Sequence, residues 1–442
     1  MKKRICLCGL LILAALLLTG CGARNISEMY ALPKRSDDYN HLQSMIDSAM
    51  YGMSYSAPRT GDNQQTVQMA DLDGDGIEEY LIFAKGATEK PLQVIILKQE
   101  EDGRCRIMEI ISSNGTAFEQ VEYANLDENP GSELIIGRLL SDQVLRSVSV
   151  YTFTDKGAEL LLMNGYARFQ TCDLDRDGLT ELMVLRPGES DSERGMAVLY
   201  SVRDGMVQRS VEKELSEDTS NIRRIQYGKL QDGSPAVFVS CSFNDRAIVT
   251  DVFAMQDGRF TNIAYASDAD TSVPSLNNFY IYPEDIDGDG ILEIPSLLTM
   301  KAVSEWKEES QKYLIRWYSL DSQGMDADKQ FTFHNFVNGW YLQLNNAWAG
   351  RVSVDQGDNT YTFYVWDASY EEATPLFSIH VFTGSSRDED AVRDGRFALY
   401  RAEGVAYAAQ LDASAAAQYA ITEEQLIDSF RLIQQDRRTG EK

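Results

Sequence analysis

Three short acidic segments have residue types and a spacing that could bind a metal ion. Each reads Asp-x-Asp-x-Asp-Gly-x-x-Glu, and they begin at Asp71, Asp173 and Asp285. Ca²⁺ takes about six to eight hard oxygen ligands, which alternate side chains of a tight turn and a backbone carbonyl at the seventh position can supply. We therefore expect about three structural Ca²⁺ ions. The predicted ligands are Asp71, Asp73, Asp75, Ile77 and Glu79; Asp173, Asp175, Asp177, Leu179 and Glu181; and Asp285, Asp287, Asp289, Ile291 and Glu293.

A weaker copy of the segment lies between the first two. Its candidate ligands are Asn125, Asp127, Asn129 and Glu133. Pro130 replaces the glycine of the sixth position and fixes φ near −65°, so this copy is at best a weak metal site. A fifth version, at residues 228–233, keeps the turn but lacks the acids. The alternative, that all these segments are acidic turns without metal, stays open.

The segments recur at a regular distance, which predicts a repeat protein. Their first positions, at residues 71, 125, 173, about 229 and 285, are 54, 48, 56 and 56 residues apart. A repeat of this length is typical of solenoids and propellers. We refer to the segments as loops 71, 125, 173, 229 and 285, and number the positions within each from one to nine.

Each loop is flanked by β-type stretches that must position it. We predict incoming strands at 66–70, 120–124, 168–172, 225–228 and 279–283, and outgoing strands at 80–84, 134–139, 182–185, 236–241 and 294–298. Hairpins complete the units, for example 94–98 with 106–110, 198–202 with 207–211, and 313–318 with 329–333. Four antiparallel strands in each of five units predict a mainly β fold, a β-propeller of about five blades, although a larger ring stays open.

Residues 66–300 resemble the FG-GAP and VCBS-type calcium-propeller repeats of integrin alpha subunits and many bacterial surface proteins. The resemblance rests on the three acidic loops and the apolar strand after each; the Phe-Gly and Gly-Ala-Pro signatures are missing. It implies calcium at the loops. An EF-hand is excluded because its twelfth position requires Glu, whereas Ile82, Val184 and Ser296 stand there.

The N-terminal residues read as an export signal. Three basic residues and a short apolar run lead to Leu18-Thr19-Gly20-Cys21. This ending resembles the bacterial lipobox, which implies a signal peptide over 1–20 and a lipid on Cys21. The expected location is the extracytoplasmic face of the cell membrane, with the lipid as the only membrane contact. A plain signal peptide with a chance Cys is the alternative.

The remaining chain divides into three predicted regions. A tether with a short helix at 38–50 covers 21–65, the calcium repeats cover 66–336, and a small α+β domain covers 337–442. That last domain is expected to hold strands at 341–344, 351–354, 361–366, 376–382, 397–401 and 405–409, and a closing helix at 423–434.

Charge and residue content exclude several function classes. With 41 basic and 68 acidic residues the chain carries a net charge of −27, which disfavours nucleic-acid partners. His41, His334 and His380 are far apart and in no metal or triad spacing, so we expect no catalytic residues. We expect buried, reduced thiols at Cys105, Cys172 and Cys241.

The predicted role is binding of a surface glycan, peptide or protein. The alternatives are a hydrolase of cell-wall or extracellular polymer and a structural spacer. All acidic loops should lie on one face of the ring, which leaves the opposite face, with its variable loops, for a ligand. Tyr166 and Trp306 are the candidate ligand residues there, although Trp306 could instead pack against the C-terminal domain.

Overall fold

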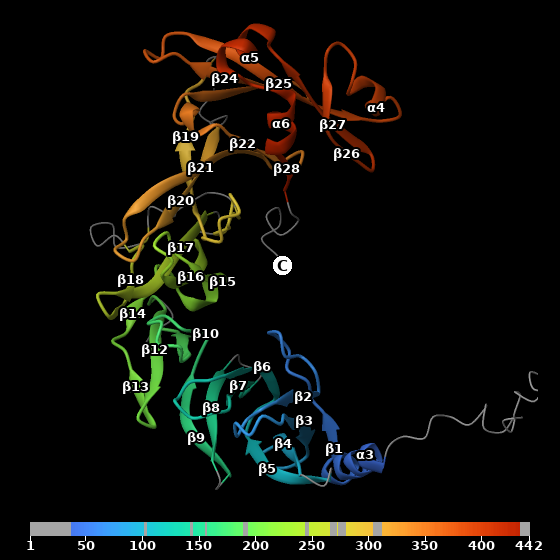
Figure 1. Cartoon of the computed structure of the whole chain (residues 1–442), viewed down its shortest axis with the longest axis vertical. Coiled ribbons are helices and arrows are strands. Elements are labelled where there is room, and N and C mark those ends of the chain that lie inside the picture. The colour runs from blue at the N-terminus through green and yellow to red at the C-terminus, as the bar shows by residue number, and fades with distance from the viewer. Residues whose placement is uncertain are drawn as a thin grey trace, which may run out of the picture. The chain divides into compact units, whose positions relative to one another are not determined.

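The computed structural model describes residues 37–100, 104–141, 145–154, 157–188, 193–243, 247–265, 272, 280–303 and 312–433. Cys21 and Trp306 lie outside these residues. The protein is mainly β and consists of antiparallel sheets (Figure 1). It forms two compact units: residues up to Ala57, Gln65–Ala70 and Ile77–Asn114 make the first, and the remaining residues the second. None of the described helices has the length and hydropathy of a membrane-spanning segment.

The first unit is one sheet covered by a helix. The helix α3 (Asp37–Ala49) confirms the one predicted at 38–50, and its Ile46 packs on Ile82 and Ile95 of the sheet. Two short strands, β1 and β2, pair with different halves of β3, and β4 and β5 follow. The strands are β1 (Met53–Tyr55), β2 (Val67–Ala70), β3 (Glu79–Gly86), β4 (Leu92–Gln99) and β5 (Cys105–Ser113).

The second unit begins with three sheets that follow the predicted plan of incoming strand, loop, outgoing strand and hairpin. They are β6 (Ala117–Ala124), β7 (Glu133–Leu139), β8 (Arg146–Thr154) and β9 (Gly157–Gly165); β10 (Arg168–Cys172), β11 (Glu181–Arg186), β12 (Met196–Arg203), β13 (Met206–Arg209) and β14 (Lys213–Glu214); and, after η1 (Thr219–Asn221), β15 (Ile222–Lys229), β16 (Pro235–Phe243), β17 (Ala247–Gln256) and β18 (Arg259–Asn262). In the second of these sheets, β13 and β14 both pair with β12.

The outgoing strands of these three sheets are buried on both faces, which explains their continuous apolar runs. Successive side chains of a strand point to opposite faces of the sheet. In β11, Leu182 and Val184 face the core shared with the β6–β9 sheet, whereas Met183 and Leu185 face the core shared with the β15–β18 sheet. Consecutive sheets of this unit therefore pack face to face.

The next sheet crosses the boundary predicted at 336/337. Its order is β19 (Ile294–Thr299), β20 (Tyr313–Leu320), β21 (Asp326–Asn335), β22 (Trp340–Leu344) and β28 (Phe430–Leu432). The turn between β21 and β22 holds the predicted boundary, and one core contains Phe333 before it and Trp340 after it. The incoming strand expected at 279–283 does not form over its described residues, 280–283, and a single bridge between Glu284 and Glu293 follows them.

The last sheet and its helices confirm the α+β content of the C-terminal region. The sheet contains β23 (Val352–Gln356), β24 (Thr360–Trp366), β25 (Ala373–Thr383), β26 (Phe397–Ala402) and β27 (Val405–Leu411). Its short helices are η4 (Asn346–Trp348), α4 (Arg387–Asp390), α5 (Ala413–Tyr419) and α6 (Glu423–Ser429).

The closing helix predicted at 423–434 is too long. It ends at Ser429, because Phe430 takes an extended conformation and begins β28, which pairs with β22. The Phe430 ring stacks on Trp340 with the ring centroids 5.7 Å apart. The packing of Phe430 against Trp340 is more favourable than another helical turn, so tertiary contacts override the helix propensity of this segment.

The three described cysteines confirm the expected buried thiols. Cys105, Cys172 and Cys241 are all buried. Burial raises the pKa of the Cys172 and Cys241 thiols, which keeps them protonated and unreactive.

Candidate metal centres

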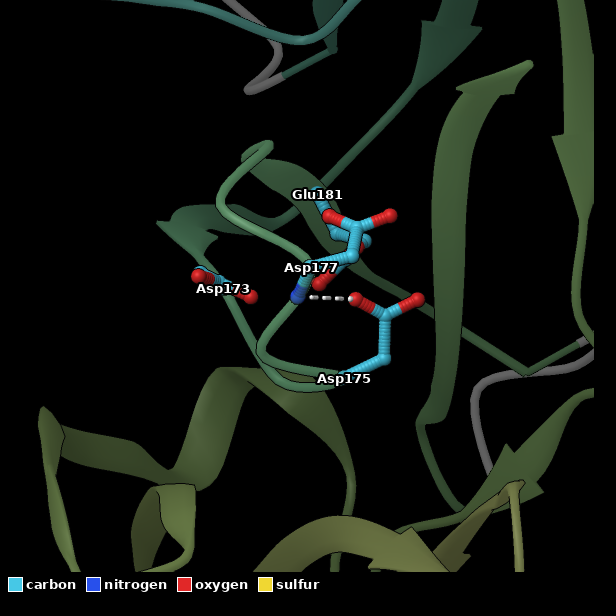
Figure 2. Close-up of side chains that lie close together, drawn as sticks. All are labelled: Asp173, Asp175, Asp177 and Glu181. Atoms are coloured by element: carbon cyan, nitrogen blue, oxygen red, sulfur yellow. Dashed lines mark hydrogen bonds between the residues drawn. The ribbon is translucent and has the colours of Figure 1, made fainter.

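Loop 173 brings its four predicted carboxylates together. One oxygen from each of Asp173, Asp175, Asp177 and Glu181 lies within 4.8 Å of the others (Figure 2). The backbone of the loop fixes these side chains. The amide of Arg176 donates to Asp173 Oδ1 at 2.7 Å, and that of Asp177 to Asp175 Oδ1 at 3.2 Å. The loop is thus a preorganised group of hard oxygen donors.

The backbone reversal requires left-handed residues at two positions of the loop. At position six φ is 88° at Gly178 and 84° at Gly290, as the glycine there predicts. Position four is also left-handed, with φ of 64° at Arg176 and 83° at Gly288. Arg176 is therefore the strained member, since left-handed conformations are unfavourable for residues with a Cβ.

Position nine is the buried end of each site. Glu181 and Glu293 are almost fully buried, and each accepts a hydrogen bond from the backbone amide of position two, Leu174 at 2.8 Å and Ile286 at 3.1 Å. Burial raises the pKa of both glutamates to about 7. The hydrogen bond from the position-two amide opposes this rise, and the neighbouring aspartates add to it. Without a cation, these carboxylates are costly to ionise.

Loop 285 contains an oxygen that a cation would satisfy. Asp285, Asp287 and Asp289 place oxygens within 4.8 Å of one another. Glu293 uses Oε2 for the Ile286 amide, while its Oε1 is buried without a hydrogen-bond partner. An unsatisfied buried carboxylate oxygen is unfavourable. The donor set of hard oxygens with this unpaired member fits a divalent cation such as Ca²⁺.

Basic side chains contact the carboxylates of the same loops. The Arg203 guanidinium lies 3.0 Å from Asp175, 2.5 Å from Asp177 and 3.4 Å from Glu181. In loop 285, Lys329 Nζ lies 2.6 Å from Asp289. Sequence spacing missed both residues because they come from strands β12 and β21, outside the loops. Their positions show that these carboxylate groups attract positive charge.

Loop 71 is divided between the two units. Asp71, Asp73 and Asp75 belong to the second unit, and Ile77 and Glu79 to the first. Within the second unit, the Asp71 carboxylate accepts hydrogen bonds from the amides of Gly74 and Gly76 at 2.7 and 3.0 Å. Asp285 accepts from Gly288 and Gly290 in the same way at 2.7 and 2.9 Å. Within the first unit, buried Glu79 lies 3.7 Å from Lys98 Nζ.

Loop 125 satisfies its own polar groups. Both carboxylate oxygens of Asp127 accept hydrogen bonds from Asn129. Glu133 accepts from the Leu126 amide at 2.7 Å and from the Thr152 hydroxyl at 3.0 Å. Because Pro130 occupies position six, the left-handed residue moves to Gly131, with φ of 107°. The weak copy therefore keeps the turn while its acids are occupied by protein donors.

A recurring hydrogen bond links the loops of neighbouring repeats. The amide at position eight donates to the carbonyl at position one of the preceding loop: Ser132 to Asp71 at 3.0 Å, Thr180 to Asn125 at 2.8 Å, and Leu292 to Lys229 at 3.1 Å. Between loops 173 and 229, the Tyr227 hydroxyl donates to the Asp173 carbonyl at 3.1 Å instead. Neighbouring loops of this series therefore lie side by side.

The remaining predicted site residues lie elsewhere. Tyr166 is 5 % exposed and packs edge-on against Phe169, and it also lines a pocket at the junction of the β6–β9 and β10–β14 sheets. His334 is buried against Tyr341, and burial lowers its pKa to about 3. The His380 ring lies between the hydroxyls of Thr360 and Ser378.

The position-seven residues lie within their loops. Ile77 is exposed, and the Leu179 and Ile291 amides donate to the position-five aspartates.

Comparisons with known proteins leave the site to be interpreted from its own residues. No protein-family model and no curated protein sequence matches the chain. Among solved structures, a protein from Lactobacillus plantarum is similar at 10 % identity over 72 % of this chain and 85 % of that one, with a TM-score of 0.28. The rhamnogalacturonan lyase YesW (11 %, 72 % and 71 %, TM-score 0.30) and a rhamnogalacturonan lyase from Bacillus licheniformis (13 %, 73 % and 72 %, TM-score 0.29) are also similar. TM-scores near 0.3 are too low to support a fold or an activity.

Proposed function

We propose that this chain is a calcium-stabilised β-propeller of the FG-GAP or VCBS type that serves as an extracytoplasmic binding protein. The observation that carries the proposal is the group of four carboxylates in loop 173, all within 4.8 Å. Like charges at such distances repel by roughly 1 to 4 kcal/mol per pair, depending on the local dielectric. A divalent cation reverses the sign of that interaction and ties the incoming strand to the outgoing strand.

The donor set favours calcium over magnesium. Mg²⁺ requires a near-ideal octahedron and keeps several waters, whereas Ca²⁺ accepts many carboxylate and carbonyl oxygens in a flexible geometry. The predicted ligands of loops 71, 173 and 285 would hold the ions, and the carbonyls of Ile77, Leu179 and Ile291 would complete each set. Bound calcium would neutralise the carboxylates of each loop and crosslink the incoming strand to the outgoing strand.

Calcium titration of the full chain tests this proposal. We expect about three calcium ions by isothermal titration calorimetry, a lower melting temperature in chelator, and its recovery on adding calcium but not magnesium. Asp285→Asn should reduce the number of ions by one. Asp232→Asn is the matched control, because Asp232 lies in the acid-poor loop 229 and accepts from the amides of Ser234 and Ser322. Absence of binding at millimolar calcium would refute the proposal.

The lipid anchor forms the second part of the proposal. The lipobox-like Leu18-Thr19-Gly20-Cys21 supports attachment through Cys21 at the extracytoplasmic face. Cys21→Ser should abolish lipid labelling and membrane retention, while calcium binding remains. Unchanged fractionation of that variant with membranes would refute the anchor alone.

We propose a binding role rather than catalysis, and the described titratable groups support this choice. His334 is neutral and buried, and the acids best placed to act together belong to the metal loops. A propeller whose loops on one face are fixed by ions offers its remaining surface for a partner. We therefore assign the chain to ligand binding, with a cell-surface glycan, peptide or protein as the partner class.

A further inference from the structure

A pocket of about 720 Å³ lies where the β6–β9 sheet meets the β10–β14 sheet. Strand β11 begins beside loop 173 at Glu181 and contributes Val184 and Arg186 to the pocket at its other end. At about 3.3 Å per residue, Arg186 lies roughly 16 Å along the strand from Glu181. The described lining of the pocket includes no residue of loop 173, although Arg209 also lines a second pocket together with Asp175 and Glu181.

The pocket lining is basic although the chain is strongly acidic. Its charged members are Arg146, Arg186 and Arg209, and no Asp or Glu belongs to the described lining. The chain as a whole carries a net charge of −27. A concentration of three guanidinium groups on such a chain makes this pocket a site of local positive potential.

Among the described residues, two carboxylates pair with the three arginines. Arg186 and Arg209 both donate to the same oxygen of Glu212, and Arg146 lies 3.7 Å from Glu119. The Nε atoms of Arg146 and Arg186 are buried without a hydrogen-bond partner. Among the described residues one positive charge thus remains in excess, and the Nε donors of Arg146 and Arg186 stay unused.

Neutral groups complete the lining. The Asn164 amide donates to the Tyr200 hydroxyl at 3.0 Å, and Tyr200 lies opposite Arg209 in the β12–β13 register. Apolar side chains from the core between the two sheets, including Val184 and Val207, form another part of the wall. The pocket therefore combines cationic, neutral hydrogen-bonding and apolar surfaces.

We propose that this pocket binds a carboxylate-bearing saccharide. Guanidinium forks match a planar carboxylate, the Asn164 and Tyr200 polar groups suit sugar hydroxyls, and the apolar wall suits the C–H face of a sugar ring. The volume lies within the range of small-molecule sites, about 300 to 1,000 Å³, and exceeds what a bare anion requires. This inference rests on the proposed binding function and specifies its ligand class.

The test uses the full chain in calcium, with galacturonic acid and its short oligomers as probes and galactose as the neutral counterpart. By calorimetry, galacturonic acid and its oligomers should bind. Comparing the affinities of the monomer and the oligomers shows whether the pocket holds one sugar unit or several. Galactose should bind at least about tenfold more weakly, which is about 1.4 kcal/mol. Affinity for the uronic acid should fall as salt rises. Equal binding of galactose, or salt-independent binding, would overturn the proposal.

Two substitutions at the pocket should act in opposite directions. Arg209→Ala should weaken uronic-acid binding at least about tenfold, since it removes one guanidinium fork. Glu212→Gln should strengthen it several-fold, because this carboxylate occupies the Arg186 and Arg209 donors. Unchanged affinity in both variants would overturn the site.

Arg401→Ala is the matched control for Arg209→Ala. Arg401 is also about half exposed and ion-paired, 3.4 Å from Asp388, but it lies in β26 far along the chain. Its substitution should leave uronic-acid affinity unchanged. Acetate or inorganic phosphate that bound as tightly as the uronic acid would show selection of an anion alone and would overturn the saccharide assignment. Calcium binding without uronic-acid binding would refute this inference and leave the calcium proposal standing. Uronic-acid binding without calcium binding would refute the calcium proposal and leave this inference standing.

Discussion

Loops 125 and 285 both end in a buried glutamate, but they differ in what satisfies its carboxylate. In loop 125, both oxygens of Glu133 accept hydrogen bonds from the protein. In loop 285, Glu293 accepts one from the Ile286 amide and leaves its second oxygen buried without a hydrogen-bond partner. Protein donors satisfy the buried carboxylate of loop 125, whereas one carboxylate oxygen of loop 285 is left for a cation.

The difference comes from one hydroxyl group on the neighbouring strand. Thr152, one residue beyond the paired Leu134 and Tyr151, donates to Glu133. Ser319 holds the corresponding place beside Glu293, but its hydroxyl donates to Gln231. A repeat can therefore satisfy its buried acid with a protein donor or with an ion, and the choice requires only a side chain on the third strand.

The largest expected effect is the pH dependence of stability in chelator. Glu181 and Glu293 have a folded pKa of about 7, above the usual 4.5, so the stability they contribute is complete below about 4.5 and lost as pH rises through 7. The loss is up to about 3 kcal/mol for each carboxyl. Thermal unfolding in chelator should show a lower melting temperature at pH 8 than at pH 5.5.

Two controls complete that experiment. Saturating calcium should remove the decline, because the ion favours the ionised carboxylates. The Glu181→Gln/Glu293→Gln variant should lose most of the decline in chelator. If that variant keeps the wild-type pH profile, other groups cause the dependence and the contrast between the loops is wrong.

The next effect separates the two kinds of loop directly. Asp175→Asn combined with Asp177→Asn should abolish the calcium-linked stabilisation of loop 173, about 2.7 kcal/mol at a free calcium concentration of 100 times the dissociation constant. Asp127→Asn in loop 125 should leave the calcium-linked gain unchanged. Denaturant unfolding with and without calcium measures both. A reduced calcium gain in Asp127→Asn would show that loop 125 binds an ion after all.

A smaller effect should follow when loop 125 is made to resemble loop 285. Thr152→Val removes the hydroxyl that donates to Glu133 and leaves a buried carboxylate oxygen without that donor. We expect a loss of about 1 to 2 kcal/mol, the same with and without calcium. Ser319→Ala, which removes only a 3.3 Å contact with Gln231, should cost less. A neutral Thr152→Val substitution would show that the hydroxyl does not distinguish the loops.

The smallest effect concerns the side chain that contacts the carboxylates of loop 173. Arg203→Gln should tighten calcium binding at that loop a few-fold, because the guanidinium no longer competes for Asp175 and Asp177. In chelator it should lower stability by less than about 1 kcal/mol, as for other partly exposed ion pairs. Calcium titration of the variant measures the change. Weaker calcium binding would mean that Arg203 supports the site instead of competing for it.

Much of the fold was predictable because the loop spacing and strand periodicity are local properties. Strands such as β10 (Arg168–Cys172) and β24 (Thr360–Trp366) occur where the alternation of side chains places them. The pairing of β22 with β21 and β28 was not predictable, since it joins strands on the two sides of the boundary expected at 336/337.

The candidate site was predictable only within its loops. The positions of Asp173, Asp175, Asp177 and Glu181 follow from a nine-residue pattern, and the structure brings them together. Arg203 comes from a strand end 22 residues after Glu181, so only the β-sheet register places it there. Tyr166 was expected in a variable loop of the face opposite the metal loops, but its ring is buried and fills a gap beside Gly137, where a Cβ would lie 2.4 Å from the hydroxyl.

The pairing of β28 with β22 has a consequence for the order in which the chain acquires its structure during synthesis. The β6–β9 and β15–β18 sheets are each complete as soon as one continuous stretch of chain has been made. The sheet that begins at β19 must wait for Phe430–Leu432, about 90 residues after its other strands. Contacts so distant in sequence form slowly. Until the last residues are available, the edge of β22 is open to other strands, and a chaperone that protects the nascent chain would be needed longest at this edge.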